Sequence, residues 1–188
     1  MQVNYARMLA VAEECRIRNR SGCPVSMSLE VFGDRWSLLI VRDLMVRGFR
    51  TFHDFTNSGE GIATNILADR LRSLAAAGIV EAEADPRDGR RVNYRLTEKG
   101  IDLAPVMLDL LIWGAQHENT GAPASVIEEM ARNRDAVLAE TRRRWLERDA
   151  RPMLPWLGGP TPRPRRAARA ATRQAATRIQ GPGKERQA

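Results

Sequence analysis

The sequence contains few residues of the types that build metal sites, disulfide frameworks and hydrolytic active sites. It has two histidines, His53 and His117, and two cysteines, Cys15 and Cys23, among 188 residues. Two cysteines cannot form a disulfide framework, and these four residues are not spaced like the close ligand pairs of a structural zinc site. The "SGEG" turn at residues 58–61 is too short for a phosphate-binding loop and does not follow a strand. We therefore expect no enzymatic activity, no cofactor and no bound metal.

Long hydrophobic runs and aromatic residues are also scarce. No apolar run approaches the roughly 18 residues that a membrane-spanning helix needs, so we expect no membrane partner. The N-terminal segment places Glu13 and Glu14 after its apolar part and lacks a small-residue cleavage site, which argues against a signal peptide. Hydrophobic residues make up 43% of the chain and aromatic residues only 5%, so a core must be mainly aliphatic. These features favour a cytoplasmic protein.

The excess positive charge is confined to one end of the chain. The formal net charge is +7, and residues 160–188 contain eight basic residues and a single acid, so this segment carries the whole excess. Residues 1–159 hold equal numbers of basic and acidic groups. An argument for nucleic-acid binding by the folded part must therefore rest on local charge placement. The basic segment has few large apolar residues, so we expect it to be disordered.

Apolar residues recur every three or four positions over most of the chain, which predicts a mainly helical protein. Pro24 suits the first turn of a helix, Thr51 and Thr97 suit N-caps, and Gly78 suits a helix end. Pro105 should kink the helix after Thr97 or mark a late start. The expected helices span residues 3–15, 25–46, 52–57, 62–77, 98–117 and 124–148. The second helix should face a core with Val25, Leu29, Phe32, Trp36, Leu39, Ile40 and Leu44.

Between the fourth and fifth expected helices the pattern changes to that of two β-strands. Residues 79–84 and 91–96 alternate apolar and polar side chains, and Pro86 with the Asp88-Gly89 pair supplies a turn between them. The acids of this turn could suggest a cation loop, but Pro86 and the neighbouring arginines favour a plain turn. The order helix, short helix, glycine turn, helix and hairpin is that of a winged helix-turn-helix. The predicted fold is therefore α+β, mainly α with a small β-hairpin wing.

This fold predicts how the chain would meet DNA. The major groove accepts one α-helix, which a compact body must hold at a fixed angle. The first turn of the fourth helix, with Thr64 and Asn65, lies where recognition helices meet base edges, although Asn65 could equally be a plain surface or capping residue. The leucine face of this helix should dock it onto the body, with Leu67, Leu71 and Leu74 against Trp36, Leu39 and Phe55.

Charged residues complete the predicted DNA-binding surface. Arginines at the hairpin tip should reach an adjacent groove or phosphates, although such arginines also occur in solvated turns. Arg70 should bind phosphate or pair with a carboxylate such as Asp43 or Asp69. The predicted DNA-contacting residues are Thr51, Ile62, Ala63, Thr64, Asn65, Ala68, Asp69, Arg70, Arg72, Arg87, Arg90 and Arg91.

Four separated stretches of the sequence resemble one known family. They are "CPVSMSLEVFGDRWSLLIVRDLMVRGFRTFHDF", "GIATNILADRLRSLAAAGIVE", "YRLTEKG" and "LLIWGAQH", and they fall in the right order with the right gaps. Together they resemble the HxlR-type transcriptional regulators of the MarR-like winged-helix group, over about residues 23–117. The resemblance implies a homodimer that binds double-stranded DNA at a pseudo-palindromic operator. We expect a repressor that is associated with the nucleoid, although the sequence does not distinguish repression from activation.

The resemblance also implies roles for particular segments. Residues 62–77 would be the recognition helix and residues 85–91 the wing. The N-terminal arm and the helix around Trp113 would flank the DNA-binding unit and form the dimer interface, with Leu108, Leu111, Ile112 and Trp113. Some relatives carry an oxidant-sensing thiol at the position of Cys23, where helix N-terminal amides could lower the thiol pKa. A buried, inert cysteine is the alternative.

We expect four segments: an N-terminal arm helix (1–22), the winged helix-turn-helix domain with its dimerisation helix (23–119), an extra C-terminal helix and proline-rich linker (120–157), and the basic tail (158–188). The tail would add salt-sensitive attraction to DNA, or act only as a solubilising extension. A small-molecule effector is a further expected partner. The alternative function for the whole chain is a winged-helix protein-interaction module without operator recognition.

Overall fold

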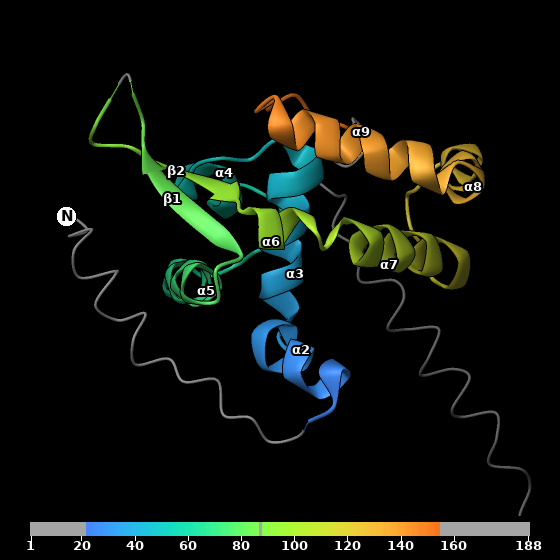
Figure 1. Cartoon of the computed structure of the whole chain (residues 1–188), viewed down its shortest axis with the longest axis horizontal. Helices are drawn as coiled ribbons and strands as arrows, with labels where there is room; N and C mark the ends of the chain where they lie inside the picture. Colours follow the sequence, from blue (N-terminus) through green and yellow to red (C-terminus); the bar gives the residue numbers. More distant parts are fainter. Residues whose placement is uncertain (1–21, 87, 155–188) are drawn as a thin grey trace, which may run out of the picture.

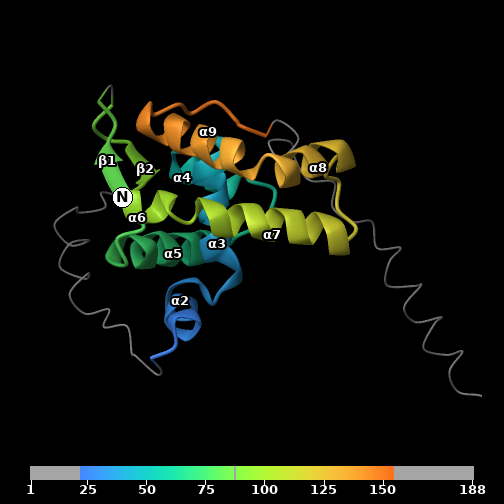
Figure 2. The same ribbon diagram turned by 45° about the vertical axis from the view of Figure 1, so that its right-hand side comes forward.

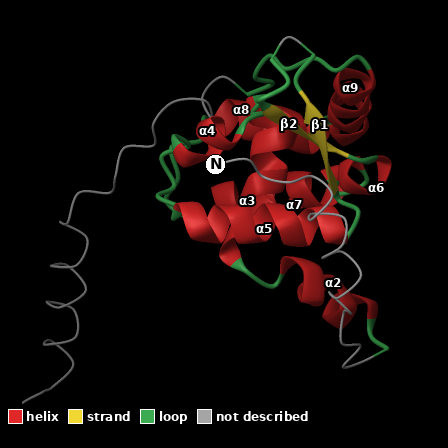
Figure 3. Ribbon diagram, turned by 90° about the vertical axis from the view of Figure 1, so that its left-hand side faces the viewer, coloured by secondary structure: helices red, strands yellow, loops and turns green. Residues whose placement is uncertain are grey.

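The computed structural model describes residues 22–86 and 88–154, so the helix expected over 3–15 and the basic segment lie outside the described residues. The described residues form a helical body with a single two-stranded sheet at one edge (Figures 1 and 3). This confirms the predicted mainly α fold with a small hairpin. The elements are α2 (Pro24–Phe32), α3 (Arg35–Arg42), η1, a π-helix (Asp43–Arg47), α4 (Phe52–Thr56), α5 (Thr64–Ala76), β1 (Val80–Ala84), β2 (Val92–Leu96), α6 (Glu98–Ile101), α7 (Ala104–His117), α8 (Ala124–Arg132) and α9 (Arg134–Leu146).

The single helix expected over 25–46 is in fact three elements, α2, α3 and η1. Asp34 starts a new helix because its Oδ1 accepts hydrogen bonds from the backbone N–H groups of Trp36 (2.7 Å) and Ser37 (3.0 Å). The predicted core stripe is therefore wrong at its beginning: Val25 and Leu29 on α2 are 68% and 58% exposed. Helix α2 projects from the body at the bottom of Figure 1.

The core beneath the hairpin is built from α3, η1, α4, α5, α6 and the sheet, and is called here the winged-helix core. The leucine face of α5 is buried as predicted, and Phe55 packs against it. The partners on α3 and η1 are Ile40, Val41 and Leu44 rather than the expected Trp36 and Leu39. Ser37, whose backbone N–H and hydroxyl both donate to Asp34, is buried as well. The buried members are Ile40, Val41, Leu44, Phe55, Leu67, Leu71, Leu74, Ile79, Val80, Leu96 and Ile101.

The predicted hairpin is present as antiparallel strands β1 and β2, in a register that pairs Val80 with Leu96 and Ala84 with Val92. Gly78, the predicted helix end, follows α5 at φ 69°, a left-handed conformation that favours glycine. The Tyr94 N–H donates to the carbonyl of Arg50 (2.7 Å), so β2 is also tied to the segment that precedes α4. The hairpin and α5 are thus held by the same core.

The C-terminal helices form a second layer. The expected helix over 98–117 begins as α6, capped by Thr97, and restarts as α7 with Pro105 in its first turn, which matches the predicted late start. The expected helix over 124–148 is interrupted at Asn133, so α8 and α9 are separate. Figure 2 shows α9 lying alongside α7.

A second cluster of buried residues, Leu108, Ile112, Met130 and Leu154, lies between these C-terminal elements and is called here the α7–α9 cluster. Over residues 22–86 and 88–154, no helix is both long enough and apolar enough to span a membrane.

Candidate nucleic-acid interface

The first turn of α5 is open to solvent. Thr64 and Asn65 are exposed, Ala63 is the N-cap residue, and no side chain caps this helix end. Ile62 is half-buried and packs against the winged-helix core, so it supports the turn from below. Helix α5 and the hairpin lie on the same side of the molecule in Figure 1. The structure therefore brings the predicted recognition helix and wing to one face.

The arginines of α5 are engaged within the protein. Arg70 pairs with Asp34 (Nη1 to Oδ2, 3.2 Å) and with Asp69, and Arg72 pairs with Asp69 (3.4 Å). The pairing of Arg70 with Asp69 was one of the two predicted alternatives, whereas Asp43 is held by Arg42 and Arg47 instead. The charges of these two α5 arginines are thus largely compensated inside the chain.

Asp34 joins helix capping to the placement of Arg70. Burial alone would raise the pKa of its carboxyl, but hydrogen bonds from the Ser37 hydroxyl and from the backbone N–H groups of Trp36 and Ser37 outweigh this, and the pKa is lowered. A carboxylate that stays ionised holds Arg70 against α3. Sequence reasoning missed Asp34, although an aspartate directly before the apolar run "RWSLLIV" is a typical N-cap pattern.

The hairpin tip presents arginines to solvent. Arg90 and Arg91 are exposed, and Arg91 reaches Asp88 with Nε 3.4 Å from Oδ2. Arg87 lies outside the described residues. Asp85 organises the turn, because it accepts hydrogen bonds from the Asp88 backbone N–H (3.3 Å) and from the Asn93 side chain (3.0 Å). Within the described part of the chain no acidic, histidine or cysteine cluster could hold a metal ion.

Thr51 caps α4, as the sequence predicts. Its hydroxyl accepts from the Asp54 N–H (3.3 Å), and the Asp54 carboxylate accepts from the backbone N–H groups of Thr51 (2.8 Å) and Arg50 (3.0 Å). Burial opposes ionisation of Asp54, but these hydrogen bonds lower its pKa overall. The Thr51 side chain is therefore occupied by the cap, and its contact with DNA stays a prediction.

The wing is braced from behind by α9, which sequence reasoning missed. The Trp145 indole N–H donates to the Leu96 carbonyl (2.7 Å), and Arg95 donates to the Trp145 carbonyl (2.7 Å). The Arg95 guanidinium also lies 4.9 Å from the centre of the indole ring. Arg148 pairs with Glu83 on β1 (3.0 Å). No short-range pattern connects residues so far apart in the chain, so the sequence contains no signal for this brace.

Cys23 lies directly before α2 and is exposed in the structure, and its role as an oxidant sensor stays a prediction. The backbone N–H groups of Ser26 and Val25 lower the pKa of its thiol below the ordinary value of 9.0. This is the predicted direction and cause. A lowered thiol pKa raises the thiolate fraction at neutral pH.

The predicted dimer residues divide into two groups. Leu108 and Ile112 are buried inside the chain, 5% and 8% exposed, because the α7–α9 cluster covers them. Their side chains are covered within the chain itself, and their part in a dimer interface stays a prediction. Trp113 is 56% exposed, and Leu111 is partly buried against the same cluster.

These features define a winged helix-turn-helix: a helical body, an exposed recognition helix and an arginine-bearing hairpin on one face. Residues 31–121 match the HxlR-like helix-turn-helix family. The uncharacterised HTH-type transcriptional regulator YybR of Bacillus subtilis (strain 168) is 34% identical over 101 residues, which cover 54% of this chain and 80% of that protein.

Two further comparisons agree. The uncharacterised HTH-type transcriptional regulator Rv3095 of Mycobacterium tuberculosis (strain ATCC 25618 / H37Rv) is 36% identical over 96 residues, covering 51% of this chain and 60% of that protein. The crystal structure of PA1607, titled as a candidate transcription factor, superposes with a TM-score of 0.51 at 39% identity, covering 56% of this chain and 72% of that one. The chain belongs to the HxlR-like helix-turn-helix family of transcription regulators. Helices α8 and α9 lie beyond the matched residues.

Proposed function

We propose that this protein is a repressor that binds a pseudo-palindromic operator as a homodimer, in the cytoplasm and on the nucleoid. The observation that carries the proposal is the exposed first turn of α5 together with an exposed, arginine-bearing hairpin tip on the same side of the molecule. Residues 23–119 would form the DNA-reading unit with its dimerisation helix, and residues 120–157 the C-terminal extension. Residues 1–22 would form an arm helix and residues 158–188 a basic tail.

The first turn of α5 would read base edges in the major groove. Asn65 can donate to and accept from the N7 and N6 edge of an adenine, and Thr64 can contact a base or a phosphate. The side of α5 that carries Ala68, Asp69 and Arg72 would lie along the major groove. Arg90 and Arg91 would bind phosphates of the flanking duplex and fix the register without reading sequence.

A footprint with matched variants tests this proposal. On DNA upstream of its own and neighbouring genes, the protein should protect two half-sites about one helical turn apart. Asn65→Ala should lose discrimination at one or two base positions. The Arg90→Ala/Arg91→Ala double variant should weaken binding uniformly and reduce the salt slope by about 2 per protomer, which is about 4 for the dimer. Arg132→Ala, an exposed arginine on α8, is the control and should change neither. Binding that is indifferent to Asn65 and to operator sequence would instead favour an interaction module.

The basic tail supplies a separate test. Because residues 1–159 are neutral overall, deletion of residues 160–188 should flatten the salt dependence of binding and keep the operator preference. An unchanged salt slope would assign the tail no part in DNA binding.

The homodimer would form through the outer face of α7. Val106, Leu110 and Trp113 are 48%, 47% and 56% exposed and follow one another at helical spacing, which makes an apolar stripe. Leu110→Glu should therefore shift the chain from dimer to monomer in sedimentation equilibrium. Leu146→Glu, at a leucine on α9 that is 64% exposed, is the matched control and should leave the dimer intact.

The Cys23 thiol would make operator binding responsive to oxidants and electrophiles. Its exposure and lowered pKa favour the reactive thiolate at a helix start close to the body. Diamide should weaken operator binding in a gel shift, and Cys23→Ser should abolish this response, with Cys15→Ser as the matched control. A full response in the Cys23→Ser variant would end this part of the proposal.

A further inference from the structure

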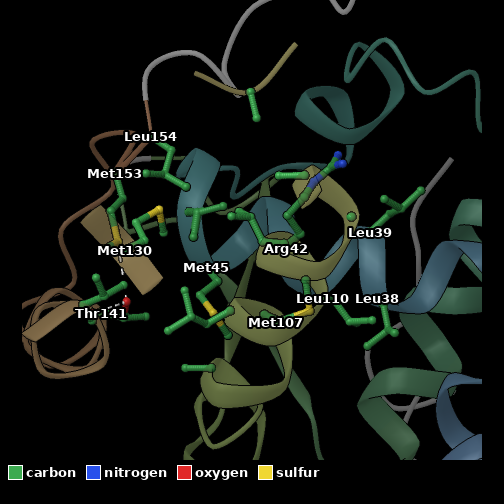
Figure 4. Close-up of a pocket in the computed structure, with 18 of the residues that line it drawn as sticks. Leu38, Leu39, Arg42, Met45, Met107, Leu110, Met130, Thr141, Met153 and Leu154 are labelled. Carbon is green, nitrogen blue, oxygen red and sulfur yellow. Dashed lines mark hydrogen bonds between the residues drawn. The ribbon is translucent and has the colours of Figure 1, made fainter. Parts of the chain in front are cut away.

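A cavity of about 680 Å³ lies between the winged-helix body and the C-terminal helices (Figure 4). One wall comes from α3 and η1, a second from α7, and a third from α8, α9 and the segment that contains Met153 and Leu154. The third wall lies beyond the residues that match the family. The volume falls in the range of pockets that enclose a small organic molecule, about 300–1,000 Å³.

The lining is aliphatic and rich in sulfur. Four methionines, Met45, Met107, Met130 and Met153, reach it from different elements, as the labelled side chains in Figure 4 show. Methionine side chains are flexible and polarisable, and they make favourable contacts with aromatic rings. The walls can therefore adapt to a flat apolar molecule better than a branched aliphatic lining could.

The polar groups of the cavity offer no net charge. The Arg42 guanidinium forms ion pairs with Asp43 (Nη2 to Oδ1, 2.7 Å) and Glu60 (Nη1 to Oε1, 3.0 Å). Its nitrogens point away from Met45 and Met107 in Figure 4. The Thr141 hydroxyl donates to the Val137 carbonyl (2.8 Å). An anionic ligand would lose its hydration without gaining an uncompensated cation.

We propose that this cavity binds an uncharged, largely apolar small molecule that carries an aromatic ring system. The inference rests on the proposed function as a regulator and on the small-molecule effector expected from the sequence, for which it supplies the site and the ligand class. Binding to the cavity is measured without DNA, so a failure here can be told apart from a failure of operator recognition.

The walls of the cavity connect to the DNA-binding surface in two ways. η1 is a π-helix, a rare geometry that is frequent at functional sites, and it continues from α3, which packs against α5. Helix α9 runs from the cavity residues Val137, Leu138 and Thr141 to Trp145, which holds the wing through Leu96. A ligand that favours one spacing of α9 from η1 therefore biases the position of the wing.

The probe is N-phenyl-1-naphthylamine, an uncharged aromatic compound whose fluorescence rises in apolar surroundings. Titration of the full chain should give a saturable rise with one site per chain and should raise the melting temperature in proportion to occupancy. The matched anionic probe, 8-anilinonaphthalene-1-sulfonate, should bind at least tenfold more weakly. The absence of a saturable site, or equal affinity for the two probes, would overturn the proposal.

Substitutions at Gly114 locate the probe. Gly114 lines the cavity, and a Cβ added there meets no atom within 4 Å. Gly114→Phe should fill the space and lower probe affinity at least tenfold, whereas Gly114→Ala should leave it within twofold. Circular dichroism reports whether each variant is folded. If Gly114→Phe does not fold, Val137→Phe fills the same cavity from α9 and replaces it in the test. Probe affinity that neither filling variant changes would place the probe elsewhere.

A second copy of the chain is the competing occupant, because Leu110 of the proposed dimer stripe also lines the cavity. If dimer formation closed the cavity, the probe signal per chain would fall as protein concentration rises through the dimerisation range, and the proposal would be wrong. If the cavity binds the probe, the signal per chain stays constant over that range. Amides of β2 should then change their hydrogen-exchange rates at least twofold on probe binding, because α9 contacts this strand.

Discussion

The winged-helix core and the α7–α9 cluster are built from similar aliphatic residues, yet they pack differently. In the first, Val41, Leu67 and Leu74 are completely buried, and Phe55 is 1% exposed. In the second, the four buried members retain 5–8% exposure and border a cavity of about 680 Å³. The two regions share one chain but differ in how completely their side chains enclose one another.

The difference matches what each region has to do. A recognition helix works only if its angle to the wing is fixed, and dense packing leaves few alternative arrangements. A region that encloses open space can adopt neighbouring arrangements at small cost, and such regions lie at the low-stability end of a fold. The comparison predicts that equal chemical changes in the two regions have unequal effects.

The largest effect should come from leucine truncation in the two clusters. Leu71→Ala removes a side chain that is 2% exposed in the winged-helix core and should lower the free energy of unfolding by about 3–5 kcal/mol. Leu108→Ala, at a residue 5% exposed beside the cavity, should cost about 2–3 kcal/mol because fewer packing contacts are lost. Urea unfolding of both variants measures the difference. Equal costs would mean that the two regions are equally well packed.

The next largest effect should come from removing a contact that connects the two regions. Trp145→Phe keeps most of the packing and removes the indole N–H that donates to the Leu96 carbonyl, at a cost of about 1–2 kcal/mol. Hydrogen exchange of β2 amides should speed up accordingly. Trp113→Phe, at the exposed tryptophan of α7, should leave β2 exchange unchanged. Unchanged exchange in the Trp145→Phe variant would show that the wing does not depend on α9.

A smaller effect, and one that depends on pH, belongs to the α4 cap. Asp54→Asn should cost about 1 kcal/mol at pH 7, because it weakens the hydrogen bonds from the Thr51 and Arg50 N–H groups. The pKa of Asp54 is lower in the folded chain than its ordinary 3.8. The stabilisation is therefore complete above pH 3.8 and is lost as pH falls through the folded pKa. Urea unfolding at pH 7 and pH 3 should show the difference between wild type and variant shrinking.

The contrast between the two regions also explains which structural features could be predicted from the sequence. Local signals were strong in the winged-helix part: Thr51 caps α4, Gly78 ends α5, and the leucine face of α5 is buried. Each of these signals depends on residues that follow one another within about one helical turn of the chain. The missed break at Asp34 was also local, but the periodic apolar residues of α2 and α3 concealed it, since exposed Val25 and Leu29 continue the pattern.

The structure of the C-terminal region could not be predicted from such local sequence signals. The break at Asn133 interrupts a helical pattern without a proline or glycine, and the brace of Trp145 on Leu96 joins residues 49 positions apart. The burial of Leu108 and Ile112 depends on α8 and on Leu154, whose location no periodicity specifies. Periodicity indicates which face of a helix is apolar but not which partner covers it. This is why the burial of Leu108 and Ile112 within the chain itself could not be predicted from the sequence.

The smallest predicted effect tests the end of α9, where the two regions meet. Arg148 adopts φ 55°, a left-handed conformation that costs a non-glycine residue about 1 kcal/mol or more, and its side chain pairs with Glu83 on the wing. Because that side chain is 61% exposed, the ion pair should contribute only about 0–1 kcal/mol. Arg148→Ala loses the pair and keeps the strained backbone, so it should be destabilised by about 0.5 kcal/mol.

Arg148→Gly also loses the pair but relieves the backbone, so it should be more stable than Arg148→Ala by about 1 kcal/mol. Thermal unfolding of the two variants side by side isolates the backbone effect, because both lack the arginine. If the two variants melt together, the turn after α9 carries no strain. If Arg148→Gly is the less stable, the left-handed residue is not what ends α9, and the brace on the wing depends instead on Trp145 and Arg95.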